Sequence, residues 1–198
     1  MPDGTKVWVN ANSTIKYPTL FSKDERRVLL DGEAYFEVAK DESKPFYVES
    51  DKATIKVLGT HFNVSDYKTL NTYSASLLEG KVNVCFKGVK AGIITLDPYE
   101  CVVKNGNSIV KKTFSNEDFL FWRKGIYSFE DCSFKEVIAQ LETYYDVKIK
   151  ILNPEVNDYR ISGKCRQRDG IEGFLKPLQK LHHFTYEKDE RENTIIIK

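Results

Sequence analysis

Residues 28–38 have the sequence VLLDGEAYFEV, and this stretch constrains the fold more than any other part of the chain. Apolar residues suited to a strand flank Asp31 and Gly32, and glycine adopts the positive φ of a tight turn without steric cost. After Gly32, side chains alternate with the period of a half-buried strand. The apolar members are Ala34, Phe36 and Val38, and the intervening residues are Glu33, Tyr35 and Glu37. The stretch therefore predicts a strand, a tight turn and a second strand.

The chain up to about residue 110 contains short apolar runs separated by turn residues, a pattern typical of consecutive β-strands. The expected strands are residues 6–10, 27–30, 34–38, 46–50, 54–57, 61–67, 72–78, 80–86, 93–96 and 100–103. No helical period persists over a dozen residues in this half. We therefore expect an all-β domain, a jelly-roll-like sandwich, with a β-solenoid-like winding as the alternative.

The hydrophobic rhythm changes within residues 113–122. Residues 115–118 are polar and can cap a short helical turn that carries Phe119, Leu120 and Trp122. A chain of 198 residues is long enough for two domains. The expected division is an all-β domain at 1–115, a linker at 116–124 and a small α+β domain at 125–198.

The sequence of the α+β domain predicts the order strand, helix, strand twice, which suggests an internal pseudo-repeat of two β-α-β units. Asp131 or Ser133 is expected to cap the first helix, with Glu136 near the capping-box position. The apolar stripes are Phe134, Val137, Ile138, Leu141 and Tyr145 in the first helix, and Ile171, Phe174, Leu175, Leu178 and Leu181 in the second. Gly173 and Pro177 fall inside the second helix, and proline crowds the preceding turn. We therefore expect that helix to be kinked or to start late.

Four blocks follow one another in the first half of the chain. They are DGTKVWVNANS at residues 3–13, VLLDGEAYFEV at 28–38, KPFYV at 44–48 and GTHFNV at 59–64. In order and spacing these blocks resemble the periplasmic domain of FecR-type anti-sigma factors. The chain departs from the family pattern mainly at Trp8 and Val9, where the family favours another aliphatic residue.

Three shorter motifs in the second half resemble the C-terminal domain that follows many FecR domains. They are F-x-D-x-S-F at residues 129–134, L-E-x-Y-Y-D-V at 141–147 and I-S-G at 161–163. That domain is similar to the short secretin and TonB N-terminal fold. The positions of Gly173 and Pro177 depart from this resemblance.

The resemblance implies a non-enzymatic signalling protein that needs no cofactor. In the family, an outer-membrane TonB-dependent transporter presents an N-terminal signalling domain in the periplasm. The anti-sigma protein's C-terminal domain contacts it, and the signal crosses the inner membrane to an extracytoplasmic-function (ECF) sigma factor. Here residues 125–198 would make that contact, with the β domain as spacer or regulatory body. The sigma-binding cytoplasmic region and one membrane helix would precede Met1, so this chain would be the exported portion.

Charge and hydropathy exclude several partners. The chain has 30 Lys and Arg against 29 Asp and Glu, for a net charge of +1, and forms no basic run. No global field therefore favours a nucleic acid or a membrane surface. No apolar run approaches the roughly 20 residues of a membrane helix, and we expect no signal peptide within these residues.

The residue types of catalysis are present without the patterns that catalysis requires. Glu33 and Glu37 on one strand would lie roughly 13 Å apart, too far for either glycosidase geometry, so we expect exposed glutamates. His182 and His183 are adjacent and His61 is remote, so we expect no metal site. Nucleophile elbows, dinucleotide loops and P-loops are all missing from the sequence. We therefore expect no enzyme, no catalytic residue and no bound metal.

A carbohydrate-binding or glycan-processing β-sandwich is the alternative function, and an accessory domain that only dimerises is a third. The first would use an aromatic platform. Phe36, Phe46 and Phe62 are expected in the core, while Trp8, Tyr35 and Tyr47 are expected to be more open; Tyr17 and Phe21 complete the aromatic set. The four cysteines, Cys85, Cys101, Cys132 and Cys165, are expected as buried thiols, although an exported protein permits disulfides.

The last five residues suggest a partner surface. Thr194, Ile195, Ile196, Ile197 and Lys198 form a β-branched run without charge until its end. Such a run pairs readily, and an unpaired edge strand attracts another strand. Strand addition to a transporter's signalling domain is therefore a hypothesis for this segment. For the side chains we favour Ile195 and Ile197 in the core and Ile196 facing outward.

Overall fold

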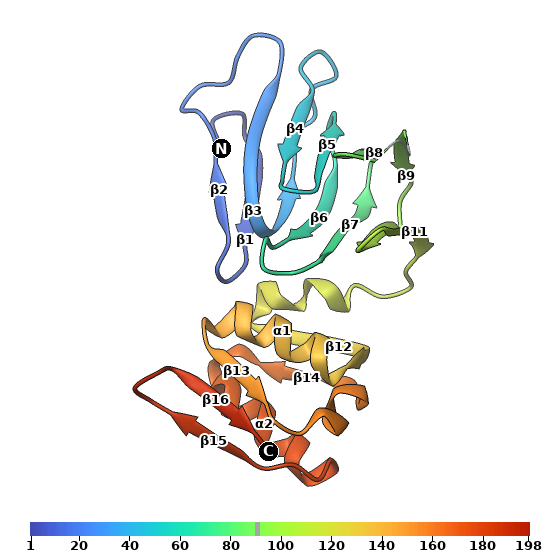
Figure 1. Ribbon diagram of the computed structural model, residues 1–198. Coiled ribbons are helices and arrows are strands. Elements are labelled where there is room, and N and C mark those ends of the chain that lie inside the picture. The colour runs from blue at the N-terminus through green and yellow to red at the C-terminus, as the bar shows by residue number, and fades with distance from the viewer. Residues whose placement is uncertain (90–91) are drawn as a thin grey trace. The chain divides into compact units, whose positions relative to one another are not determined.

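The computed structural model describes residues 1–89 and 92–198 and contains two compact units, Met1–Glu117 and Asp118–Lys198 (Figure 1). The first unit is built from strands and the second from strands and helices. The β-rich class expected from the sequence is confirmed.

Over its described residues, the first unit contains eleven strands joined by hydrogen bonds into one curled sheet (Figure 1). The strands are β1 (Lys6–Val9), β2 (Thr14–Lys16), β3 (Arg26–Glu37), β4 (Phe46–Glu49), β5 (Ala53–Val57), β6 (His61–Asp66), β7 (Thr72–Glu79), β8 (Val82–Phe86), β9 (Ile93–Leu96), β10 (Glu100–Asn105) and β11 (Ser108–Thr113). Their order is β11-β10-β7-β6-β3-β4-β5-β8-β9, and β1 and β2 pair with β3. Most pairs are antiparallel, but β3 and β4 are parallel.

The expected tight turn at Asp31-Gly32 is wrong, because β3 runs without interruption from Arg26 to Glu37. Its first part pairs with β2 and β4, and the part that starts at Gly32 pairs with β6 and, further along, β1. Gly32 has a φ of +108°, and a Cβ there would lie 2.8 Å from Cα of Ser13. The glycine therefore bends the strand where its pairing partners change from β2 and β4 to β6, and it does not reverse the chain.

The continuity of β3 also changes the expected architecture. A jelly-roll sandwich would consist of two separate sheets, whereas here one sheet curls around a single apolar core. The core includes Val28, Phe36, Phe46 and Phe62, each almost fully buried. Two strands were not expected from the sequence. β2 has only three residues, and β11 contains two lysines and no buried side chain.

The second unit begins with the 3₁₀ helix η1 (Asp118–Lys124), where a short helical turn was expected. Its other elements are β12 (Ile126–Ser133), α1 (Phe134–Tyr145), β13 (Lys148–Ile151), η2 (Pro154–Asp158), β14 (Arg160–Arg166), η3 (Gln167–Asp169), α2 (Gly170–Leu181), β15 (Tyr186–Asp189) and β16 (Thr194–Ile197). β12 pairs with β14, and a separate three-stranded sheet has the order β13-β16-β15.

The two helices pack their apolar stripes into one core with these strands. Ser133 caps α1, and Glu136 completes the capping box that the sequence predicted. α2 starts at Gly170 and continues through Pro177, so of the two expected alternatives, a kink or a late start, the late start is wrong. Leu181 was expected in the stripe but is 75% exposed, because it is the last residue of the helix.

Candidate interaction site

The strand suggested as a partner surface lies in the centre of its sheet. β16 pairs in parallel with β13 on one side and antiparallel with β15 on the other (Figure 1). Both backbone edges of Thr194–Ile197 are therefore occupied, and strand addition to this segment would have to break existing pairs. The premise of an available edge was wrong because pairing partners are set by tertiary structure, which a short β-branched run does not reveal.

The side chains of β16 point as the sequence predicted. Ile195 and Ile197 are buried in the core of the unit, and Ile196 is only half-buried. Thr194 is buried and Lys198 is exposed. The strand therefore contributes mainly to stability, and a partner can reach only part of it.

The free edges of this sheet belong to β13 and β15. Along β13, the Lys148 N–H donates to the Asn193 carbonyl and the Leu152 N–H to the Ile197 carbonyl. The Ile149 N–H therefore faces outward, where it donates to Oε1 of Glu142 at 2.7 Å. On β15, Glu187, Lys188 and Asp189 are exposed. The edge of β13 is thus partly blocked by α1, whereas β15 lies at the open edge of the sheet.

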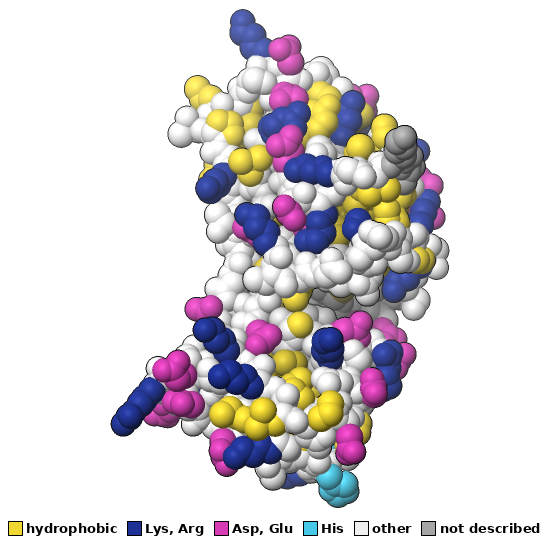
Figure 2. All heavy atoms as spheres, viewed as in Figure 1, with side chains coloured by type: hydrophobic (Ala, Val, Ile, Leu, Met, Phe, Trp, Pro, Cys, Tyr) yellow, Lys and Arg dark blue, Asp and Glu magenta, His cyan; other side chains and the backbone are white. Residues whose placement is uncertain are grey.

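The outer face of the three-stranded sheet is charged. Residues that lie side by side across the strands share a face, so the register places Lys148 and Lys150 beside β16 and Glu187 and Asp189 on its other side. The side chain of Lys198 forms an ion pair of 2.7 Å with Glu187. In Figure 2, side chains of both charge signs gather where this sheet lies in Figure 1.

In the first unit, Glu33 is buried and hydrogen-bonded rather than exposed as expected. Its carboxylate accepts from Asn10 Nδ2 at 2.7 Å and from Asn63 Nδ2 at 2.9 Å, and its side chain is 6% exposed. Burial raises the pKa of Glu33 to about 7, although the hydrogen bonds from Asn63 and Asn10 lower it. Two amide donors make the buried carboxyl group tolerable. Glu37, by contrast, is half-buried and lies 3.6 Å from the Lys6 ammonium.

A second buried polar group holds the start of β3. The Arg26 side chain is 2% exposed and donates to Asp3 Oδ2 at 2.9 Å and to the carbonyl oxygens of Ala39 and Lys44. Burial alone would raise the pKa of Asp3, but hydrogen bonds from Thr5 and Arg26 hold it below its usual value. The group therefore ties the amino terminus to the middle of the unit.

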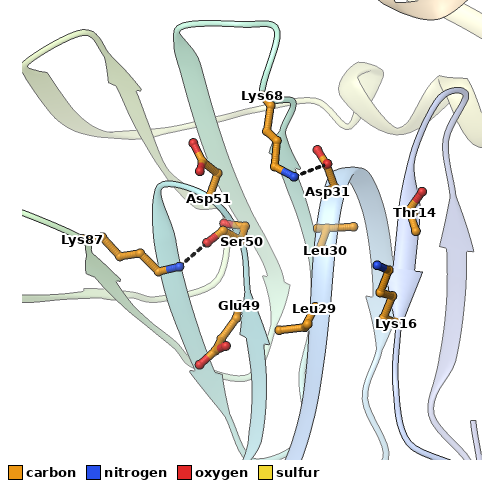
Figure 3. Close-up of a pocket in the computed structure, with 10 residues that line it drawn as sticks. All are labelled: Thr14, Lys16, Leu29, Leu30, Asp31, Glu49, Ser50, Asp51, Lys68 and Lys87. Atoms are coloured by element: carbon orange, nitrogen blue, oxygen red, sulfur yellow. Dashed lines mark hydrogen bonds and ion pairs between the residues drawn. The ribbon is translucent and has the colours of Figure 1, made fainter.

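The first unit also contains an open pocket of about 360 Å³ (Figure 3). It is lined by Thr14, Lys16, Leu29, Leu30, Asp31, Glu49, Ser50, Asp51, Lys68 and Lys87. Lys68 lies 2.6 Å from the Asp31 carboxylate, and Lys87 donates to the Ser50 carbonyl at 2.6 Å. None of these ten residues is aromatic, so the pocket lacks the stacking surface that a sugar site would use.

The other candidate residues do not form a reactive centre. Phe36, Phe46 and Phe62 are in the core as expected, but Tyr35 is 4% exposed and is not an open platform residue. Trp8 packs on Tyr35 with ring centroids 5.6 Å apart, and the Arg27 guanidinium covers Tyr47. Over the described residues, no group of three or more His, Cys, Asp and Glu side chains can hold a metal ion.

The four cysteines are free thiols with different environments. Cys101 is buried as expected and Cys132 and Cys165 are half-buried, whereas Cys85 is exposed on β8. Burial raises the pKa of Cys165 to about 11. In residues 1–89 and 92–198 no helix is both long and apolar enough to cross a membrane.

Comparison with known proteins identifies the family. The family described as FecR protein matches residues 1–83, and FecR, C-terminal, matches residues 126–197. The chain belongs to the FecR family of anti-sigma factors. A crystal structure of a proposed anti-sigma factor from Parabacteroides distasonis is 33% identical, with a TM-score of 0.87, and the match covers 100% of this chain and 92% of that chain. A second crystal structure of a proposed anti-sigma factor from the same organism is 34% identical, with a TM-score of 0.85 and coverage of 100% and 91%. No curated protein matches.

The sequence blocks that indicated the FecR family come together in the first unit. Asn10, Glu33 and Asn63 belong to three different blocks and form one hydrogen-bonded group. The sequence contained one indication that Glu33 is buried. Ala34, Tyr35 and Phe36 are consecutive and bulky or apolar, which indicates a strand covered on both faces. The partners of Glu33 could not be inferred, because Asn10 and Asn63 lie far from it in the sequence.

Proposed function

We propose that this FecR-family chain is the periplasmic part of an anti-sigma factor and relays a signal by protein–protein contact. The signal would come from an outer-membrane TonB-dependent transporter, through its N-terminal signalling domain. It would pass to an ECF sigma factor through a cytoplasmic region outside the two units described above. The observation that carries this proposal is that FecR and FecR C-terminal families match successive parts of one chain.

The second unit is proposed as the receiver of the signal. It matches the FecR C-terminal family, and its three-stranded sheet has an exposed, charged outer face and an open edge at β15. Charged surfaces of this kind favour selective contact with another protein. The first unit is proposed as a spacer or regulatory body, because its buried polar groups make it a single firmly connected element.

Binding of the full chain to a transporter's signalling domain tests the proposal. The partner is the purified signalling domain of the TonB-dependent transporter encoded beside the gene for this protein, titrated in a calorimeter. The matched control is the signalling domain of a transporter encoded elsewhere in the same genome. We expect saturable one-to-one binding to the first domain and at least tenfold weaker binding to the second. Failure of the first domain to bind at about 100 μM protein would contradict the proposal.

A further inference from the structure

We propose that β15 is the docking edge for a partner strand, so that the signalling partner extends the β13-β16-β15 sheet by one strand. This inference rests on the proposed function and adds the place and geometry of the contact. It replaces the carboxy-terminal strand as the edge, because β16 is paired on both sides.

The register identifies the main-chain groups that are free on β15. Thr185 and Lys198 exchange both of their backbone hydrogen bonds, at 3.0 and 2.8 Å. In an antiparallel pair the bonded positions recur every second residue, so Glu187 and Asp189 also face β16. The N–H and C=O groups of Tyr186 and Lys188 therefore point away from the sheet. A partner strand would find two donors and two acceptors at the spacing of a β-ladder.

The other edge of the sheet is less suitable. Its outward Ile149 N–H already donates to Glu142 at 2.7 Å, so a strand added beside β13 would have to displace a charged side chain from α1. Side chains that satisfy an edge in this way discourage pairing with other chains. Because β13 is partly blocked and β15 is open, β15 is the more favourable edge for extending the sheet.

The side chains of β15 define the chemistry of the partner strand. Glu187 and Asp189 lie on the outer face, and Tyr186 packs against the core of the unit on the inner face. The matching strand would carry Lys or Arg on its outer face and an apolar side chain opposite Tyr186, since opposite charges across a ladder attract.

A second copy of this chain does not fit the same edge. In a two-fold antiparallel pair centred on residue 187, the two Glu187 side chains would lie directly opposite each other. Centring the pair on Lys188 would place Glu187 opposite Asp189 of the other copy. Like charges at directly opposed positions are destabilising, so β15 favours a different protein over self-association.

Two substitutions of Lys188 distinguish a main-chain contact of β15 from a contact made by the Lys188 side chain. Lys188→Pro removes an outward N–H and leaves the bonds to β16 in place, which edge strands tolerate. Lys188→Ala keeps the N–H and removes only the charge. In calorimetric titrations with the neighbouring transporter's signalling domain, we expect Lys188→Pro to bind at least tenfold more weakly than the unchanged chain. Lys188→Ala should bind within about threefold of it.

Amide hydrogen exchange of the unchanged chain, followed by NMR, gives a second test that does not depend on a variant's folding. In the free protein we expect slow exchange at Glu187 and Asp189 and fast exchange at Tyr186 and Lys188. Saturation with the signalling domain should slow exchange at Tyr186 and Lys188.

Binding without that protection, or unimpaired binding of a folded Lys188→Pro variant, would overturn β15 as the edge and leave the proposed function standing. No binding by the unchanged chain would overturn both, and a dimer of this chain through β15 would overturn the choice of partner.

Discussion

Asn63 donates a hydrogen bond of 2.9 Å from Nδ2 to Oε1 of Glu33, while its own Oδ1 is buried without a hydrogen-bond partner among the described residues. The amide of Asn63 can therefore rotate and offer its oxygen to a donor at position 33. A protonated Glu33 would be such a donor. The pair can accommodate either protonation state of the carboxyl group, which has a direct consequence for stability.

The free energy of unfolding of the first unit should fall as the pH rises from 4.5 to about 7, because Glu33 is buried. The ordinary pKa of 4.5 applies to the unfolded chain, and burial raises it to about 7 in the folded protein. Between pH 4.5 and about pH 7, the folded state retains a proton that the unfolded state has lost. The stability is therefore highest below pH 4.5 and declines until the pH reaches the pKa of the folded protein. The full effect is on the order of 3 kcal/mol.

Glu33→Gln should remove this decline, since glutamine is neutral at every pH and the Asn63 oxygen can accept from it. The measurement is the free energy of unfolding in urea at pH 5.5 and pH 8.5 for the variant and the unchanged chain. Glu37→Gln is the matched control, because Glu37 lies on the same strand but is only half-buried. A pH dependence equal in all three proteins would show that Glu33 does not titrate in this range.

Gly32→Ala should strongly destabilise the first unit, because an added Cβ would overlap Ser13 in addition to the strain of a positive φ. Gly88→Ala is a matched control: Gly88 also has a positive φ, but a Cβ there would meet nothing within 4 Å. We expect Gly32→Ala to cost at least about 2 kcal/mol more than Gly88→Ala. Urea unfolding measures both, and equal costs would mean that the close approach of Ser13 is unimportant.

Limited proteolysis should first cleave the chain within residues 114–117, which join β11 to η1 and have no helix or strand structure. Exposed irregular segments between compact units are the preferred sites of nicking. Mass spectrometry of early products should show an N-terminal β fragment and a C-terminal fragment beginning near Asp118. Early cleavage spread evenly over the chain would argue against two separately packed domains.

Local patterns in the sequence predicted local structure well. Ser133 and Glu136 predicted a helix start because a capping box involves residues only three positions apart, and the alternation in β16 predicted which isoleucines are buried. Long-range pairing was not predictable in the same way. Gly32 suits a turn as well as a bend within a strand, and only the pairing of β3 with both β4 and β6 distinguishes them.

Long-range pairing also decided the candidate interaction site, and local sequence could not reveal it. The run of isoleucines at 195–197 indicated a strong strand, but whether it lies at an edge or in the centre depends on β13 and β15, which its own sequence does not contain. The charged sequence of β15 made it unremarkable as a strand. Charged residues are nevertheless typical of edge strands, and this physical rule would have been the better guide to the exposed edge.

We propose that the second unit receives the signal from a transporter. Hydrogen–deuterium exchange of the full chain, read by mass spectrometry with and without a saturating amount of the neighbouring transporter's signalling domain, measures where that domain binds. We expect added protection in peptides from residues 118–198, including those that cover β15, and unchanged exchange in residues 1–113. Protection confined to residues 1–113, or no protection anywhere at saturation, would contradict it.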